Sequence, residues 1–133
     1  MSAAEIRAFL AGVEWVAIGT LDASGAPHAD AAAALLAGER LWFAVASASP
    51  AAAHLDRDPR VCCAADVFPS YYEIKGVTVH GRARRADPGE AARVRAELAA
   101  RAGRQELAAD EIWWVPALED GFGFDFARIA ARG

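Results

Sequence analysis

The sequence predicts a mainly β (α+β) protein, a small antiparallel barrel with short flanking helices. Runs of strand-forming residues recur roughly every 10 to 15 residues, and turn clusters such as DASGAP at 22–27 stand between them. Helix signals are too few to alternate with these strands, so a parallel sheet with crossover helices is not expected. At 133 residues the chain fits a single domain covering residues 1–133.

The N-terminal residues predict a short helix followed by a hairpin. Ser2 and Glu5 have the spacing of a capping box, and the apolar residues after them share one helical face until Gly12, a typical C-terminal stop. EWVAIGTL at 14–21 is rich in strand formers and leads into the DASGAP turn. A hairpin partner is expected from residue 28 to about 36. Its alanines favour a helix by propensity, so only the flanking turns argue for a strand.

The middle of the chain predicts a strand, a loop with two serines, a short helix and a second strand. LWFAV at 41–45 is the first strand, and Ser47 and Ser49 lie in the loop after it. Residues 50–57 give about two helical turns before an Asp-Pro pair ends the helix. VCCAADV at 61–67 is then a buried strand.

The last third of the chain predicts one long strand, one helix and two final strands. FPSYY at 68–72 is an irregular connection, and the longest strand follows at 74–85 with one apolar and one polar face. An Asp-Pro-Gly-Glu start predicts a helix over about 87–102. Residues 111–129 give two further strands, broken at Pro116 and at a later glycine.

The composition limits the classes of partner. The formal net charge of −4 argues against a nucleic-acid binder, which carries a basic excess. The first apolar run contains Glu5 and Arg7 and does not predict a signal peptide, and no apolar run reaches the length of a membrane span. We therefore expect no membrane partner and a cytoplasmic location.

The cysteines and histidines predict neither a disulfide framework nor a metal site. Cys62 and Cys63 are adjacent in a strand, so their side chains point to opposite faces, and a buried structural role is expected for the pair. The three histidines, His28, His54 and His80, lack the spacing of metal ligands.

The loop at 46–49, which joins a strand to a helix, is the candidate ligand site. Such a loop presents unpaired backbone N–H groups and the positive end of the helix dipole, which attract anions. Ser47 and Ser49 add hydroxyls, yet no lysine or arginine lies between Arg40 and Arg57. An ordinary connection with Ser49 as N-cap is the competing interpretation.

Three further features have two interpretations each. Lys75 lies on the apolar face of its strand, where it either reaches solvent or meets an acid or an anionic ligand. His80 is on the opposite face, which suits either a small polar pocket or a solvated row. Trp113 and Trp114 either stack on a planar ligand or pack in the core or a dimer interface.

Several motifs follow one another in a specific order. They are VAIGTLDASGAPHA as a first hairpin, LWFAVASAS as a strand and loop, HLDRDPRVCCA as a helix ending in Asp-Pro before a strand, and VTVHGRARR as a strand ending in Gly-x-Ala. In this order and spacing, the chain resembles the pyridoxamine 5′-phosphate oxidase-like FMN-binding split-barrel family over nearly its whole length.

The resemblance implies an antiparallel split barrel that forms a homodimer, with FMN in a cleft between the subunits and a small-molecule substrate that is unknown. It also implies oxidoreductase chemistry carried by the flavin, so the catalytic side chains are unknown. The cofactor-binding residues that the resemblance implies are Val45, Ala46, Ser47, Ser49, His54, Lys75 and Gly76.

The sequence departs from the family's pattern at the phosphate contacts. Where the family's loop commonly has threonine, serine and lysine, this chain has Val45, Ser49 and Ala51. Asp30 stands where the second strand often brings an arginine, and its charge would repel a phosphate. Gly76 takes the place of a common glutamine.

Three functions fit these residues. The first is a divergent FMN-binding oxidoreductase, in which Lys75 or an arginine of the partner subunit replaces the lost cations. The second is a split barrel with a deazaflavin or haem. The third is a cofactor-free barrel that binds a small molecule or serves as an interaction module. If the loop faces a phosphate, Ala51→Lys is expected to raise the affinity for FMN.

Overall fold

The computed structural model describes residues 2–67, 75–101, 109–117 and 121–125. Its helices and strands, in chain order, are α1 (Ala3–Ala11), β1 (Trp15–Leu21), β2 (Pro27–Ala37), β3 (Arg40–Val45), α2 (Pro50–Arg57), β4 (Arg60–Val67), β5 (Lys75–Arg82), β6 (Arg84–Arg85), α3 (Pro88–Arg101), β7 (Glu111–Pro116) and β8 (Gly121–Asp125). The predicted irregular connection at 68–72 lies outside the described residues.

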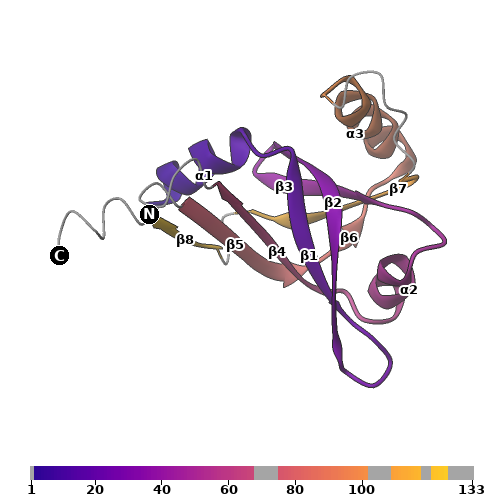
Figure 1. The fold of residues 1–133 in the computed structure, drawn as a ribbon. Coiled ribbons are helices and arrows are strands. Elements are labelled where there is room, and N and C mark those ends of the chain that lie inside the picture. Colours follow the sequence, from indigo (N-terminus) through magenta and orange to yellow (C-terminus); the bar gives the residue numbers. More distant parts are fainter. Residues whose placement is uncertain (1, 68–74, 102–108, 118–120, 126–133) are drawn as a thin grey trace.

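Within the described residues, eight strands form one antiparallel sheet in the order β6-β7-β3-β2-β1-β4-β5-β8. The sheet curls into a half-barrel, with α1 and α2 near opposite ends and α3 packed on the outer face of β2, β3 and β7 (Figure 1). This confirms the predicted mainly β fold, an antiparallel split barrel with short flanking helices. None of the helices in the described part of the chain is long and apolar enough to cross a membrane.

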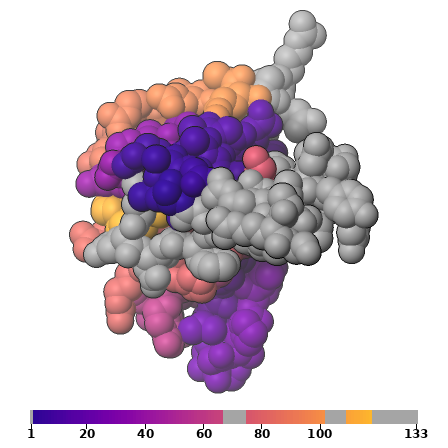
Figure 2. All heavy atoms as spheres, turned by 90° about the vertical axis from the view of Figure 1, so that its left-hand side faces the viewer, coloured from indigo at the N-terminus to yellow at the C-terminus, as the bar shows by residue number. Residues whose placement is uncertain are grey.

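The hairpin of β1 and β2 forms as predicted, because the DASGAP turn is closed by its own side chains. Asp22 Oδ1 accepts the N–H groups of Ser24 and Ala26, each at 2.9 Å, and Gly25 has a φ of 84°. The tip of the hairpin projects from the body of the molecule, as the space-filling view shows (Figure 2).

The alanine-rich strand β2 connects the two halves of the barrel. Its first part pairs with β1, from Pro27 opposite Leu21 onward. Its last part pairs with β3, up to Ala37 opposite Arg40. Strand pairing overrides the helical propensity of the alanines in β2, because each of them lies opposite a residue of β1 or β3 and several are buried.

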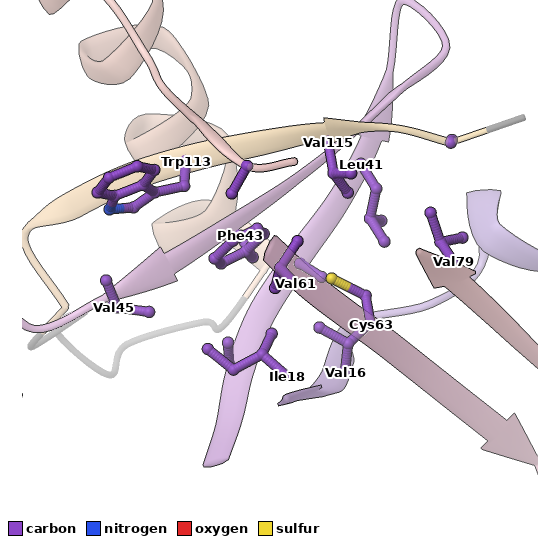
Figure 3. Packing of buried hydrophobic residues seen from close by; sticks show 14 of the residues in the cluster. Val16, Ile18, Leu41, Phe43, Val45, Val61, Cys63, Val79, Trp113 and Val115 are labelled. Atoms are coloured by element: carbon purple, nitrogen blue, oxygen red, sulfur yellow. The ribbon is translucent and has the colours of Figure 1, made fainter. Parts of the chain in front are cut away.

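The core lies between the two halves of the curled sheet. Figure 3 shows inward-facing side chains from strands of both halves meeting there, with Phe43 and Val79 fully buried. Trp113 is part of this core, and its ring N–H donates to Glu111 Oε1 at 3.2 Å. The indole of Trp113 therefore has a packing role, whereas Trp114 is half-buried on the opposite face.

The single strand predicted over 74–85 is wrong, because the chain divides it into β5 and β6. At Ala83 the backbone N–H donates to the Pro59 carbonyl at 2.7 Å and leaves the ladder with β4. The next two residues, Arg84 and Arg85, pair with β7 instead. The period-2 pattern continues through the break, so no local signal in the sequence marks the change of partner strand.

The barrel narrows where β5 passes β7. A Cβ built on Gly81 would lie only 2.7 Å from Val115 Cγ2, and Val115 is fully buried. Gly81 therefore allows the two halves of the sheet to approach, which is the role of a strand glycine at a close backbone contact.

Candidate functional site

The predicted loop at 46–49 connects β3 to α2, and Ser49 is the N-cap of α2. Ser49 Oγ accepts the Ala52 N–H at 3.2 Å and donates to the Ala46 carbonyl at 2.6 Å. The Ser49 N–H also donates to Ala46, at 2.9 Å. These bonds use the Ser49 hydroxyl and the Ala46 carbonyl within the loop itself.

The second loop serine, Ser47, binds the carboxylate of Asp110. The Ser47 N–H donates to Asp110 Oδ1 at 2.7 Å, and Ser47 Oγ donates to Asp110 Oδ2 at 2.8 Å. These bonds lower the pKa of the Asp110 carboxyl, and the positive charge of Arg95 lowers it further. The two Ser47 donors of the candidate anion loop are therefore bound to an ionised carboxylate of the chain itself, that of Asp110.

The two residues Val45 and Ala51, which lie on either side of the loop, point into the core. Val45 and Ala51 are only 5% and 1% exposed, and both belong to the core. Of Val45, only the backbone borders the loop. Ala51 stands where the family commonly has lysine, and here its side chain packs in the core and not toward the loop.

His54, on α2, lies in a small polar cluster at the base of the hairpin. Its Nδ1 is 2.9 Å from Thr20 Oγ1, and its ring meets that of His28 edge to face at 5.2 Å. Thr20 is 2% exposed. His28 Nε2 is buried and has no hydrogen-bond partner among the residues that the structure describes. His54 therefore contacts β1 and β2 on the face of the hairpin that also carries Asp30.

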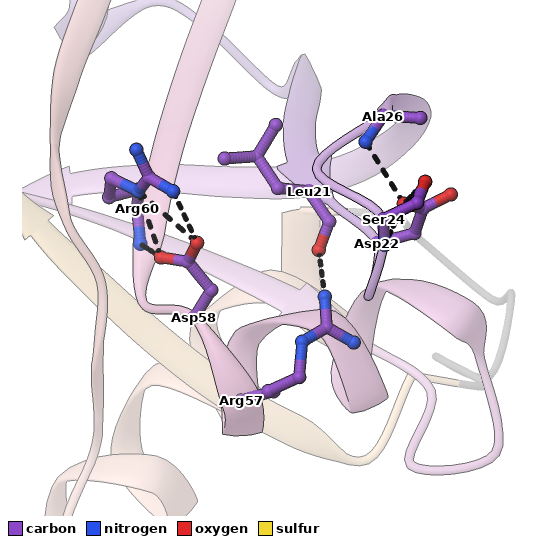
Figure 4. A network of polar contacts seen from close by, with 7 residues as sticks. All are labelled: Leu21, Asp22, Ser24, Ala26, Arg57, Asp58 and Arg60. Carbon is purple, nitrogen blue, oxygen red and sulfur yellow. Dashed lines mark hydrogen bonds and ion pairs between the residues drawn. The ribbon is translucent and has the colours of Figure 1, made fainter.

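Two arginines form polar contacts where α2 ends and β4 begins (Figure 4). Arg57, at the end of α2, donates to the Leu21 carbonyl at 2.6 Å. Arg60, at the start of β4, forms an ion pair with Asp58 at 2.7 Å and lowers the pKa of that carboxyl to about 2. The Arg57 bond connects the end of α2 to the end of β1, and the Asp58–Arg60 pair lies in the short connection from α2 to β4.

Lys75 and Gly76 do not join the loop within one chain. They begin β5, beside the last residues of β4, whereas α2 leads into the first residue of β4. An eight-residue strand is about 25 Å long. Lys75 borders a different cavity, of about 550 Å³, whose lining includes Trp15, Glu14 and Asp66.

His80 and Cys62 are cross-strand neighbours on the outer face of the sheet. Together with Arg60 they border a cavity of about 260 Å³. Burial raises the pKa of the Cys62 thiol, and raises that of Cys63 to about 12. Cys63 is buried, as expected for the pair, but Cys62 is half-exposed.

Sequence reasoning missed Asp110, Thr20 and His28 as neighbours of the site. Asp110 reaches Ser47 because β7 pairs with β3, which sets Glu111 opposite Val45. In the sequence Asp110 is only an acid before a strand, so the pairing of the two strands was the missing information. Thr20 and His28 are opposite one another in the predicted hairpin, and that register could have revealed them.

The curled antiparallel sheet and the capped loop between β3 and α2 define a split-barrel protein. The family model described as pyridoxamine 5′-phosphate oxidase matches residues 2–131. The chain therefore belongs to the pyridoxamine 5′-phosphate oxidase family, as the resemblance of its motifs implied. No curated protein matches the chain in sequence.

Three solved structures illustrate the likeness of the fold. A conserved hypothetical protein from Mycobacterium tuberculosis is 22% identical with a TM-score of 0.83, over 98% of this chain and 88% of that one. An FAD binding protein from Mycobacterium smegmatis is 22% identical with a TM-score of 0.67, over 95% and 98%. A heme binding protein from the same organism is 24% identical with a TM-score of 0.70, over 98% and 61%. Identities this low show a shared fold only.

Proposed function

We propose that this protein is a flavin-binding oxidoreductase that works as a homodimer, with the cofactor in a cleft between the subunits. The observation that carries the proposal is membership of the pyridoxamine 5′-phosphate oxidase family over residues 2–131. Among proteins with this fold, one is named as FAD binding and another as heme binding. Redox chemistry would come from the cofactor, so we assign no catalytic side chain.

The separation of the two predicted halves of the site supports a dimer. Within one chain, the loop at 46–49 and the cavity beside Lys75 lie at opposite ends of the sheet. A second copy can place its loop against that cavity, whose volume of about 550 Å³ is in the range of ligand sites. The complete site would then consist of the loop of one subunit and Lys75 of the other.

The outer face of the sheet supports the same proposal. Trp15, on β1, is 57% exposed, which is unusual for a large apolar side chain, and it borders the cavity beside Lys75. Next to it the strands carry small side chains, including Ala17, Ala31 and Ala64, which face the same side. A surface of small side chains with one large exposed aromatic side chain suits contact with a second copy.

The residues around the loop do not fit the phosphate of FMN. The Ser47 donors are bound to Asp110, and the Ala51 side chain is buried. Asp30 adds a carboxylate on the hairpin face that carries His28 and faces α2. The proposal therefore concerns the flavin as a ring system, and it assigns no step to the phosphate.

A second candidate function is a barrel without a redox cofactor, which binds another small molecule or serves as an interaction module. The observation that favours it is the internal bonding of the loop, because Asp110 already satisfies the Ser47 donors. Haem and a deazaflavin stay open as other cofactors of the same fold.

The first experiment is a binding test on the purified protein. We expect riboflavin, FMN or FAD at saturating concentration to raise the melting temperature, since a ligand specific to the folded state stabilises it. Flavin fluorescence should change in the same titration. The same titrations with haem and with a deazaflavin show whether either of these cofactors stabilises the protein more than a flavin does. A protein that no flavin stabilises, and whose absorbance shows no bound flavin, would contradict the proposal and favour the second candidate.

Substitution of Trp15 tests the dimer. Trp15→Asp should convert the dimer into a monomer in sedimentation equilibrium, because it puts a charge into an apolar contact. At protein concentrations where wild type is also monomeric, its free energy of unfolding should differ from wild type by no more than about 1 kcal/mol, since the side chain is exposed in one subunit. Ala53→Asp, at an exposed position of α2, is the matched control and should stay dimeric. A wild-type monomer, or a dimer that survives Trp15→Asp, would contradict this interface.

A further inference from the structure

The Asp110 carboxylate binds the β3–α2 loop in the way that an anionic ligand would. Both of its oxygens are used, one on the Ser47 N–H and one on the Ser47 hydroxyl, at 2.7 and 2.8 Å. A backbone N–H and a serine hydroxyl at a helix start are the donors that phosphate oxygens commonly use. Asp110 and a phosphate would therefore compete for the same two donors.

The fold holds Asp110 in this position. Asp110 directly precedes β7, and β7 pairs with β3 along its whole length, from Val45 opposite Glu111 to Arg40 opposite Pro116. Since Ser47 follows β3 closely, the end of this ladder brings Ser47 and Asp110 together. The contact is thus set by a strand pairing between distant parts of the sequence.

The charges near the loop do not offset a second anion. Arg85 is already paired with Asp56 at 2.6 Å and with Glu111 at 3.1 Å. Arg57 donates to the Leu21 carbonyl, and Arg95 acts on Asp110 itself. A phosphate at Ser47 would meet the charge of Asp110 at close range, where repulsion between like charges is strong.

We infer that Asp110 determines the ligand specificity of the loop: it excludes a phosphate group and favours a ligand whose end at the loop is uncharged. The inference rests on the proposed flavin binding for its ligand class. Riboflavin and FMN are the matched pair for the test, since they share the ring system and the ribityl chain and differ only by the phosphate.

The experiment compares the dissociation constants of riboflavin and FMN for the wild type and for Asp110→Asn, which keeps the shape and removes the charge. Wild type should bind riboflavin at least as tightly as FMN. Asp110→Asn should raise the affinity for FMN about tenfold or more and should change that for riboflavin by less than about twofold. Asp56→Asn removes an exposed charge of α2, leaves Arg85 paired with Glu111, and should leave the ratio unchanged.

A second measurement keeps this inference separate from the proposed function. Inorganic phosphate should raise the melting temperature of Asp110→Asn and of Asp110→Ala more than that of wild type or Asp56→Asn. Equal phosphate effects in all four proteins, or an unchanged ratio of FMN to riboflavin affinity, would overturn the role of Asp110. If no flavin binds but phosphate stabilises only the Asp110 variants, the proposed flavin binding is wrong and the role of Asp110 is supported.

Discussion

Ala51→Lys is expected to destabilise the folded protein by about 2 to 4 kcal/mol, through overpacking and burial of a charge. Ala51 is in the first turn of α2, is 1% exposed and packs in the core. A lysine there must either place its ammonium group in the core or push α2 away from the sheet. This reverses the expectation from the family pattern, in which a lysine at this position improves FMN binding.

Urea unfolding of Ala51→Lys and of Ala53→Lys measures this effect. Ala53 lies on the same helix but is exposed, so its substitution should change the free energy of unfolding by no more than about 0.5 kcal/mol. If both variants are as stable as wild type, the side chain at 51 has access to the loop. The FMN affinity of Ala51→Lys should then rise, as the family pattern predicts.

Gly81→Ala is expected to destabilise the barrel by about 1 to 3 kcal/mol, the usual cost of overpacking. The added Cβ would lie 2.7 Å from Val115 Cγ2, where no ordinary contact is made. Val115 is β-branched and fully buried, so its side chain has little freedom to rotate away. The backbones of β5 and β7 must therefore move apart, and this loosens the packing between the two halves of the sheet.

Gly19→Ala is the matched control for this prediction, because its Cβ would lie at an ordinary 3.6 Å from Cys62 Cβ. Its stability should be equal to wild type or slightly higher, since alanine loses less backbone entropy on folding. The double variant Gly81→Ala/Val115→Ala should cost less than the sum of the two single variants. Equal stability of Gly81→Ala and Gly19→Ala would show that the sheet adapts at this point.

The features that could be predicted from the sequence are those that depend on near neighbours in the chain. The helix caps at Ser2, Ser49 and Asp87 form as their spacing predicts, each within three residues of its partner. The turn at Asp22 closes in the same local way. The strand predicted over 14–21 from its strand-forming residues is confirmed as β1.

The site could be predicted only in part. The position and the N-cap of the β3–α2 loop follow from local sequence, and so does its lack of a cation. Three properties needed the fold: the inward direction of Ala51, the contact of His54 with Thr20, and the presence of Asp110 at Ser47. Each depends on two elements that are far apart in the sequence.

The antiparallel barrel class, the family and the place of the candidate loop could be predicted from local patterns in the chain, because periodicity, turns and caps act over a few residues. The contacts of the loop, in contrast, depend on how distant strands pair in the folded chain. The pairing of β3 with β7 puts the Asp110 carboxylate on Ser47, and the length of β4 keeps Lys75 away. A loop that looked like an anion site without its cation is a loop that already holds an anion of its own, because strand pairing brings charges together without regard to their separation in sequence.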